Sequence, residues 1–239
     1  MDLCETKVAD VVASNIKTAH VFKKYGIDFC CGGGVSIEKA CEKKNIDLNT
    51  LLQDLSDVDN KVLPSQNFNN WELDFLIVYI VNTHHTYVKE ALELIEAYAS
   101  KVANVHGKAE PAVVRIYELF QVVAREMTSH MFKEEEILFP YIKNLIAVQK
   151  GRTIWSAPHF ETVTNPISMM EHEHETVGDV LKQIASISNN YTPPDWACNT
   201  FRALYAKLDE FEQDLHIHVH LENNILFPKA IQIEKVLLT

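Results

Sequence analysis

The sequence has few of the residues that interrupt helices and few features of membrane or secreted proteins. Only 7 of its 239 residues are glycine and 8 are proline, so long helices are expected. The longest uninterrupted apolar run, residues 75–81, is far too short to cross a bilayer. No basic stretch followed by an apolar one opens the chain, and the five cysteines are irregularly spaced. We therefore expect a cytoplasmic protein with reduced thiols and no disulfide framework.

Basic residues are also scarce. The chain has 22 Lys and Arg against 33 Asp and Glu, a formal net charge of −11. This balance argues against nucleic acid and against anionic membrane surfaces as partners. The length of 239 residues leaves room for one large domain or two unequal ones, and 47% hydrophobic residues is ordinary for a soluble globular protein.

One motif occurs twice. Residues 130–140 and 218–228 both follow the pattern H-x-x-x-E-x-x-I-L-F-P, and the two copies begin 88 residues apart. Residues four apart lie on one face of a helix, so each copy can direct a histidine and a glutamate to one point. The Ile-Leu-Phe-Pro tails are interpreted as core packing with a helix end at the proline.

The rest of the chain divides into three parts. Residues 1–57 predict a small helical domain, in which one amphipathic helix ends near Gly26 and Ser36 caps another. Residues 58–70 are polar and rich in asparagine, which is typical of a linker. Residues 71–239 contain four long patterns of apolar residues spaced three and four apart, which predict an up-down four-helix bundle. The expected fold class is all-α.

Polar residues interrupt the apolar seam of each predicted bundle helix. Buried imidazoles and carboxylates are unfavourable unless they satisfy one another or bind something. The histidines lie 46, 44 and 44 residues apart, so alternating helices bring them to a similar height. The six candidate metal ligands are His84, His130, Glu134, His174, His218 and Glu222.

Four histidines and two glutamates fit two six-coordinate metal ions, with the glutamates bridging and positions left open. Mixed imidazole and carboxylate ligation favours non-haem iron over zinc, calcium or magnesium, with manganese still open. Helical phase separates the other nearby histidines from the seam, and they are interpreted as exposed or outer-shell residues: His85, His172, His216 and His220. Glu126 and Glu173 are candidates to orient ligands from outside.

The first domain carries two adjacent thiols, Cys30 and Cys31, followed by three glycines. Adjacent cysteines cannot bridge one another without strain. The nearby Lys23 and Lys24 favour thiolates, which would suit a thiol relay that binds iron or nitrosyl or exchanges disulfides. The alternative is that both cysteines are small buried residues in a turn.

Together these motifs resemble a known family. The doubled H-x-x-x-E with His84 and His174 resembles haemerythrin-like di-iron domains, and residues 23–33, Lys-Lys-Tyr-Gly-Ile-Asp-Phe-Cys-Cys-Gly-Gly, resemble the N-terminal domain of the repair-of-iron-centres proteins of the YtfE/ScdA type. Carried over by position, the resemblance implies that the six ligands named above hold two irons, with Glu134 and Glu222 bridging. Cys4, Cys41 and the long segment 150–163 depart from the family pattern.

The resemblance implies a cytoplasmic homodimer that repairs iron–sulfur clusters damaged by nitrosative or oxidative stress. The two irons, joined by oxo, hydroxo or carboxylate bridges, would be donated to damaged iron–sulfur proteins or would handle nitric oxide. Such a protein is a repair protein more than a turnover enzyme, although a nitric oxide reductase activity is compatible with it. The alternative function is an oxygen or nitric oxide carrier or sensor. A ferritin-like oxidase is disfavoured because that class prefers carboxylate-rich sites.

Overall fold

The computed structural model describes residues 3–58 and 67–238. Its regular elements are helices, and within these two ranges the chain forms no β-strand beyond one isolated bridge between Lys7 and Ser36. The all-α prediction is therefore confirmed. Most of the predicted linker, residues 59–66, lies outside the described residues. No described helix is both long and apolar enough to cross a lipid bilayer.

The chain forms two compact units. The first contains residues 1–78, 142–157 and 216–239, and the second contains residues 79–141 and 158–215. The first unit thus collects the N-terminal residues together with two later stretches, and each unit is described by itself below.

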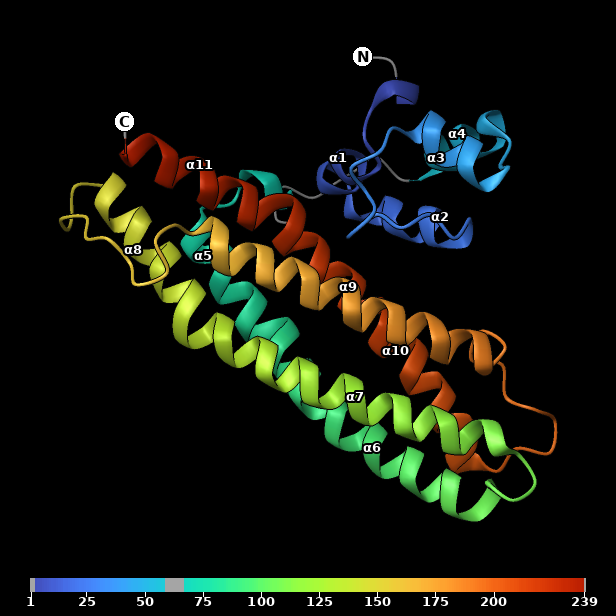
Figure 1. Ribbon diagram of the computed structural model, residues 1–239. Coiled ribbons are helices and arrows are strands. Elements are labelled where there is room, and N and C mark those ends of the chain that lie inside the picture. Colours follow the sequence, from blue (N-terminus) through green and yellow to red (C-terminus); the bar gives the residue numbers. More distant parts are fainter. Residues whose placement is uncertain (1–2, 59–66, 239) are drawn as a thin grey trace. The chain divides into compact units, whose positions relative to one another are not determined.

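The first unit is built from short helices in the N-terminal part and longer ones in the later stretches (Figure 1). Its elements are η1 (Leu3–Glu5), α1 (Val8–Ser14), η2 (Ile16–Thr18), α2 (Ala19–Lys24), α3 (Ile37–Lys44), α4 (Leu48–Asp57), η4 (Phe68–Asn70), α5 (Leu73–Tyr79), η7 (Glu222–Leu226), α11 (Phe227–Leu237) and most of α8 (Phe139–Gln149). Helix α1 packs against η4 and η7. Phe22, Ile37 and Leu51 are fully buried in this unit.

The N-terminal domain differs in one respect from its sequence pattern. The single helix predicted from Val8 to Tyr25 is interrupted at Asn15, whose backbone is extended (φ −148°, ψ 97°). The Asn15 side chain accepts a hydrogen bond from the backbone N–H of Lys17, which lets it cap the next turn. Two other predictions are confirmed: Gly26 adopts a left-handed φ of 64°, and the Ser36 side chain caps α3.

The second unit contains the long helices. Its elements are η5 (Ile80–His85), α6 (Thr86–His106), α7 (Pro111–Lys133), η6 (Glu134–Leu138), α9 (Thr164–Ile187) and most of α10 (Asn199–Leu221). Helix α7 packs between α6 and α9, as Figure 1 shows. Phe120 of α7 meets Phe211 of α10 edge to face, with ring centroids 5.8 Å apart.

Both copies of the repeated motif fold in the same way. In each, the histidine lies near the end of an α-helix and the glutamate begins a short π-helix, η6 at Glu134 and η7 at Glu222. A new α-helix then starts at the phenylalanine, with the proline in its first turn, where no N–H is needed. The predicted helix end at the proline is therefore wrong, because the chain continues as α8 and α11.

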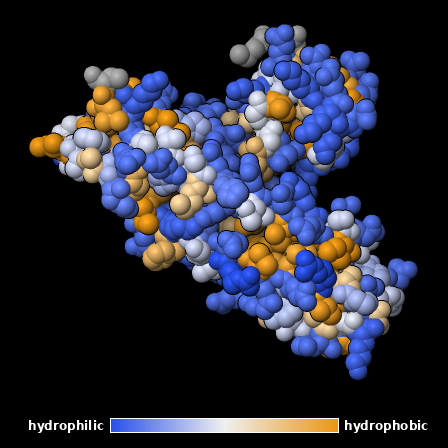
Figure 2. All heavy atoms as spheres, viewed as in Figure 1, coloured by the Kyte–Doolittle hydropathy of each residue, from blue (hydrophilic) through white to orange (hydrophobic). Residues whose placement is uncertain are grey.

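A π-helix shifts the phase of every residue that follows it. Its i→i+5 hydrogen bonds add about one residue to a turn. After Glu134, Leu138 is buried and Ile137 is 38% exposed, whereas in the second copy both Ile225 and Leu226 are buried. On the face shown in Figure 2, hydrophilic residues cover most of the surface over α3 and α4.

Candidate metal centre

The second unit buries a group of imidazole and carboxylate side chains, which we call the histidine–glutamate cluster: His84, His85, His130, Glu134 and His174. All five are at most 3% exposed. Helix α7 supplies His130, η6 supplies Glu134 and α9 supplies His174. These three offer ligand atoms within 4.8 Å of one another. The structure thus brings together three of the predicted ligands from three elements.

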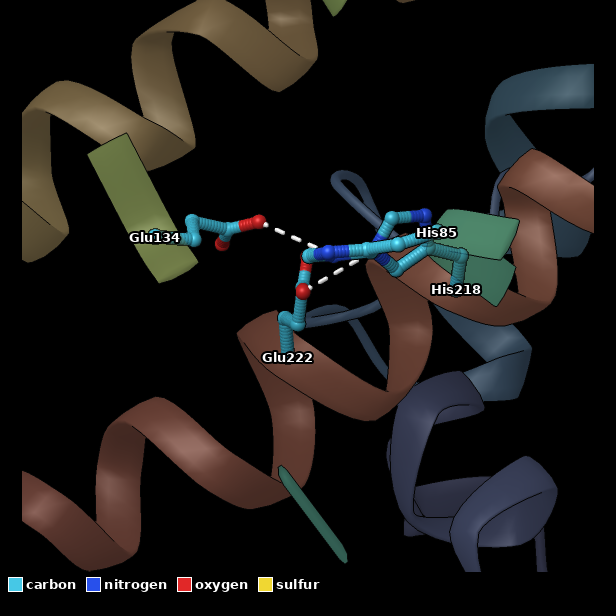
Figure 3. Close-up of side chains that lie close together, drawn as sticks. All are labelled: His85, Glu134, His218 and Glu222. Atoms are coloured by element: carbon cyan, nitrogen blue, oxygen red, sulfur yellow. Dashed lines mark hydrogen bonds and ion pairs between the residues drawn. The ribbon is translucent and has the colours of Figure 1, made fainter. Parts of the chain in front are cut away.

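Two adjacent histidines of η5, His84 and His85, are buried in this unit. Among the described residues, the sets of ligand atoms within 4.8 Å of one another include His85 but not His84. His84 was predicted as a ligand, and its Nδ1 lies 2.9 Å from an Asp214 carboxylate oxygen. His85 was interpreted as exposed or outer-shell, yet it is fully buried, and its Nε2 lies 3.3 Å from a carboxylate oxygen of Glu134 (Figure 3). Both residues belong to the π-helix η5. The phase argument that separated them assumed 100° per residue, which holds for an α-helix only.

Each of three imidazoles presents its Nδ1 atom to a carboxylate. Asp214 lies against His84, Glu135 lies 2.8 Å from His85, and Glu173 lies 3.0 Å from His130. A carboxylate accepts the Nδ1–H, which selects one tautomer and directs the Nε2 lone pair to the opposite side. This is the usual way in which proteins orient histidines that bind metals.

The low pKa of Glu173 agrees with this arrangement. Burial raises its pKa, but hydrogen bonds from His130 and Lys133 outweigh burial and bring the pKa to about 2. A carboxylate with a lowered pKa accepts hydrogen bonds, which agrees with a proton on His130 Nδ1. Glu135 is held similarly: hydrogen bonds from Lys89 and His85 lower its pKa against the effect of burial.

The donor set fits a metal cation. With its proton on Nδ1, His130 directs a lone pair from Nε2 toward His174 Nε2 at 2.9 Å and a Glu134 oxygen at 3.3 Å. Lone pairs this close repel unless a proton or a cation lies between them. Buried imidazole nitrogens and a carboxylate oxygen are suitable ligands for a transition metal.

The second copy of the motif places its two polar residues alike in the first unit. His218 of α10 and Glu222 of η7 are both fully buried, with 2.9 Å between Nε2 and a carboxylate oxygen. Figure 3 shows this pair pointing toward one another, as it does for His85 and Glu134. The structure thus repeats one histidine–glutamate geometry in each copy of the motif.

The outer-shell candidates behave differently from one another. Glu173 contacts His130, as described above. Glu126 lies one turn before His130 and is half-buried, and it makes no hydrogen bond or ion pair with another described side chain. Asp214 and Glu135 were not predicted. They could have been identified as acidic residues on neighbouring predicted helices, at the same level along the bundle as a candidate histidine ligand.

The cysteine loop of the first unit is ordered by Asp28. One Asp28 carboxylate oxygen accepts hydrogen bonds from the backbone N–H of Cys30 (3.0 Å) and of Cys31 (3.1 Å), and from the Cys30 thiol (3.2 Å). Cys30 is buried and Cys31 is exposed. A hydrogen bond with Cys31, burial and the charge of Asp28 all raise the pKa of the Cys30 thiol.

The expected effect of the lysines on Cys30 is therefore wrong: its pKa rises instead of falling. Lys24 instead pairs with Asp54, with 2.6 Å between Nζ and the carboxylate oxygen. In the described chain the five cysteines form no disulfide.

Residues of helix α10 and the π-helix η7 contact this loop within the same unit. The Asn224 side chain donates to the Cys30 carbonyl (3.0 Å), and the Phe29 ring contacts the rings of His216 and His220 edge to face at 5.9 Å. Burial lowers the pKa of His220 to about 4, partly offset by the Phe29 carbonyl. His220 was interpreted as exposed or outer-shell, but it is fully buried under the cysteine loop.

Fold and site define a class of protein. Residues 76–230 match the family described as "Hemerythrin HHE cation binding domain", and residues 4–59 match ScdA_N, a domain of unknown function. The chain belongs to the haemerythrin HHE cation-binding family, with an ScdA_N domain preceding the haemerythrin domain. The family is described as cation-binding, and the buried imidazole and carboxylate groups of the cluster are of the kind that bind cations.

Named relatives share both parts. The chain is 36% identical over 212 residues to the iron-sulfur cluster repair protein YtfE of Yersinia pseudotuberculosis serotype IB (strain PB1/+). The aligned region covers 89% of this chain and 90% of the relative. It is 35% identical over 216 residues to the iron-sulfur cluster repair protein YtfE of Yersinia pestis (strain Pestoides F), covering 90% and 92%.

Proposed function

We propose that this protein repairs damaged iron–sulfur clusters and that it holds two iron ions for this purpose. The observation that carries the proposal is similarity over about 90% of both chains to proteins named for this activity. The buried donors of the histidine–glutamate cluster support metal binding independently of that similarity.

The proposed ligands are the six predicted from the sequence, joined by one more. His84, His130, Glu134, His174, His218 and Glu222 would supply the ligands for the two irons. His85 is added because its Nε2 faces Glu134 at 3.3 Å. Imidazole and carboxylate ligands together favour iron. When bound, iron supplies open coordination positions for nitric oxide or oxygen and is also the cargo for a damaged cluster.

We propose a separate role for the cysteine loop. Cys31 is exposed, whereas Cys30 is buried and keeps its proton. Cys31 is thus the thiol able to meet a client protein, and Cys30 supports it. The proposal also includes a thiol relay, a role in the stress response, a homodimeric assembly and a cytoplasmic location. Light scattering of the purified protein tests the dimer.

Recovery of a damaged cluster enzyme tests the function. Aconitase inactivated with nitric oxide is incubated anaerobically with the iron-loaded protein, and its activity is followed. The wild type should restore activity, whereas a double variant H130A/H218A should not. The matched control H20A/H159A replaces two exposed histidines and should act as the wild type does.

The assay also separates iron donation from binding of nitric oxide alone. Mössbauer spectra of ⁵⁷Fe-loaded protein, taken before and after recovery, should show iron leaving the protein. No recovery with the wild type, or equal recovery with H130A/H218A, would refute the proposed function.

A further inference from the structure

Two lysines contact the carboxylates that orient the cluster histidines. Lys89 Nζ donates to Glu135 at 2.8 Å, and the same Glu135 oxygen lies 2.8 Å from His85 Nδ1. Lys133 donates to one oxygen of Glu173, whose other oxygen lies 3.0 Å from His130 Nδ1. Each carboxylate is therefore held between an imidazole and an ammonium group.

The two arrangements have the same design. In each, the histidine and the lysine lie three or four residues apart on one continuous helical run, so they share a face. The carboxylate comes from a neighbouring element, Glu135 from η6 and Glu173 from α9. We call each set of three residues a clamp: His85–Glu135–Lys89 and His130–Glu173–Lys133.

Charge explains what the lysine adds. A carboxylate held only by an imidazole N–H is a partly buried anion whose second oxygen can turn toward other donors. The ammonium group opposes that charge. Lys133 also holds the second oxygen of Glu173, whereas Lys89 shares one oxygen of Glu135 with His85. The imidazole is then held with Nε2 toward the cluster. Fixing its orientation therefore costs less conformational entropy when a metal binds.

The two clamps differ in exposure. The Lys133 and Glu173 side chains are 27% and 18% exposed, whereas Lys89 and Glu135 are 55% and 26% exposed. Solvent and salt screen an exposed ion pair more strongly. The clamp of Lys133 should therefore act more strongly on its histidine than the clamp of Lys89.

We propose that Lys89 and Lys133 are positioning residues that set how tightly the site holds its metal ion, with Lys133 the more important. This inference rests on the metal binding assumed in the proposed function. It adds that residues outside the ligand set control how readily the site retains or releases its metal ion. An iron donor has to balance these two tendencies.

Binding of Co²⁺ to the metal-free protein, measured in competition with a chromophoric chelator, tests the proposal. K133M should weaken binding about 10-fold, in the range known for residues that support metal ligands. K133R should restore most of the affinity, because arginine can hold the same carboxylate. K89M should have a smaller effect, and K101M, an exposed position on the same helix α6, should have none. If K133M does not fold, K133Q takes its place.

A double-mutant cycle shows whether Lys133 acts through Glu173. E173Q alone should weaken Co²⁺ binding, and adding K133M should change it little further. Wild-type affinity in K133M, or an equal loss with and without E173Q, would overturn the proposal. Co²⁺ binding does not depend on cluster repair. The role of the clamps can therefore be confirmed even if the repair assay fails, and repair can be confirmed even if the lysine variants bind Co²⁺ as the wild type does.

Discussion

The Nε2 atom of His85 lies 3.3 Å from a carboxylate oxygen of Glu134, and both side chains are fully buried. His84, its neighbour in the chain, is buried as well and presents Nδ1 to Asp214. In an α-helix, adjacent residues point about 100° apart. The π-helix η5 brings both imidazoles into the interior of the same unit. This gives the site one more histidine than helical phase predicts.

Replacing these histidines one at a time measures the contribution of each to metal binding. We expect H85A to lower metal affinity by about 10-fold, because its ring faces Glu134, and H84A to lower the iron content as well. Iron per chain, from elemental analysis after reconstitution, checks both. H172A, an exposed histidine on α9, is the control. Wild-type iron binding by H85A would return the role to His84 alone.

Removing the metal should destabilise the protein. A ligand that binds only the folded state adds about 2.7 kcal/mol at 100 times its dissociation constant. We therefore expect the metal-free protein to melt at a lower temperature, and the melting temperature to rise with added Fe²⁺ under anaerobic conditions. H174A should lose this response, whereas H159A, at an exposed position, should keep it. A melting temperature of the wild type that is independent of metal would contradict the assignment.

The two adjacent cysteines should react at very different rates. Cys31 is exposed, while the pKa of Cys30 is raised by its hydrogen bond with Cys31, by burial and by Asp28. At pH 8, iodoacetamide should therefore alkylate Cys31 first, as read by peptide mass spectrometry. Equal labelling of both thiols in the folded protein would show that the loop does not protect Cys30.

The same raised pKa predicts how stability depends on pH. The folded state holds the Cys30 proton more tightly than the unfolded chain, whose thiol pKa is about 9. The contribution of Cys30 to stability is therefore fully present below pH 9 and is lost as the pH rises through the folded-state pKa. In urea unfolding at pH 8 to 10, C30A should show a weaker fall of stability with pH than the wild type.

Two adjacent glycines of the cysteine loop offer a matched pair. A Cβ on Gly33 would lie 2.4 Å from the Phe29 carbonyl oxygen and 2.9 Å from the Ala9 Cβ, whereas a Cβ on Gly34 would meet nothing within 4 Å. Because the nearest atom is backbone, G33A should destabilise the protein by about 1–3 kcal/mol. G34A should be close to neutral. Urea unfolding of both variants makes the comparison, and equal stabilities would contradict the packing described for the loop.

Much of this protein could be predicted from its sequence. The scarcity of glycine and proline and the spacing of apolar residues predict an all-α fold, which the structure confirms. The doubled motif places a histidine and a glutamate on one helix face in each copy, and the structure buries both pairs. These features were accessible because they depend on residues close together in the chain.

The amino-acid sequence is sufficient to predict the helical class, to identify the doubled histidine–glutamate motif and to reveal the resemblance to a metal-binding family. Tertiary structure decided the rest. The π-helix η5 shifts the phase of the seam, so that His85 turns inward beside His84. The carboxylates of the clamps come from elements that neighbour the helix carrying the histidine and the lysine. Side-chain periodicity assumes a constant 100° per residue and describes one helix at a time, so neither feature could be derived from it.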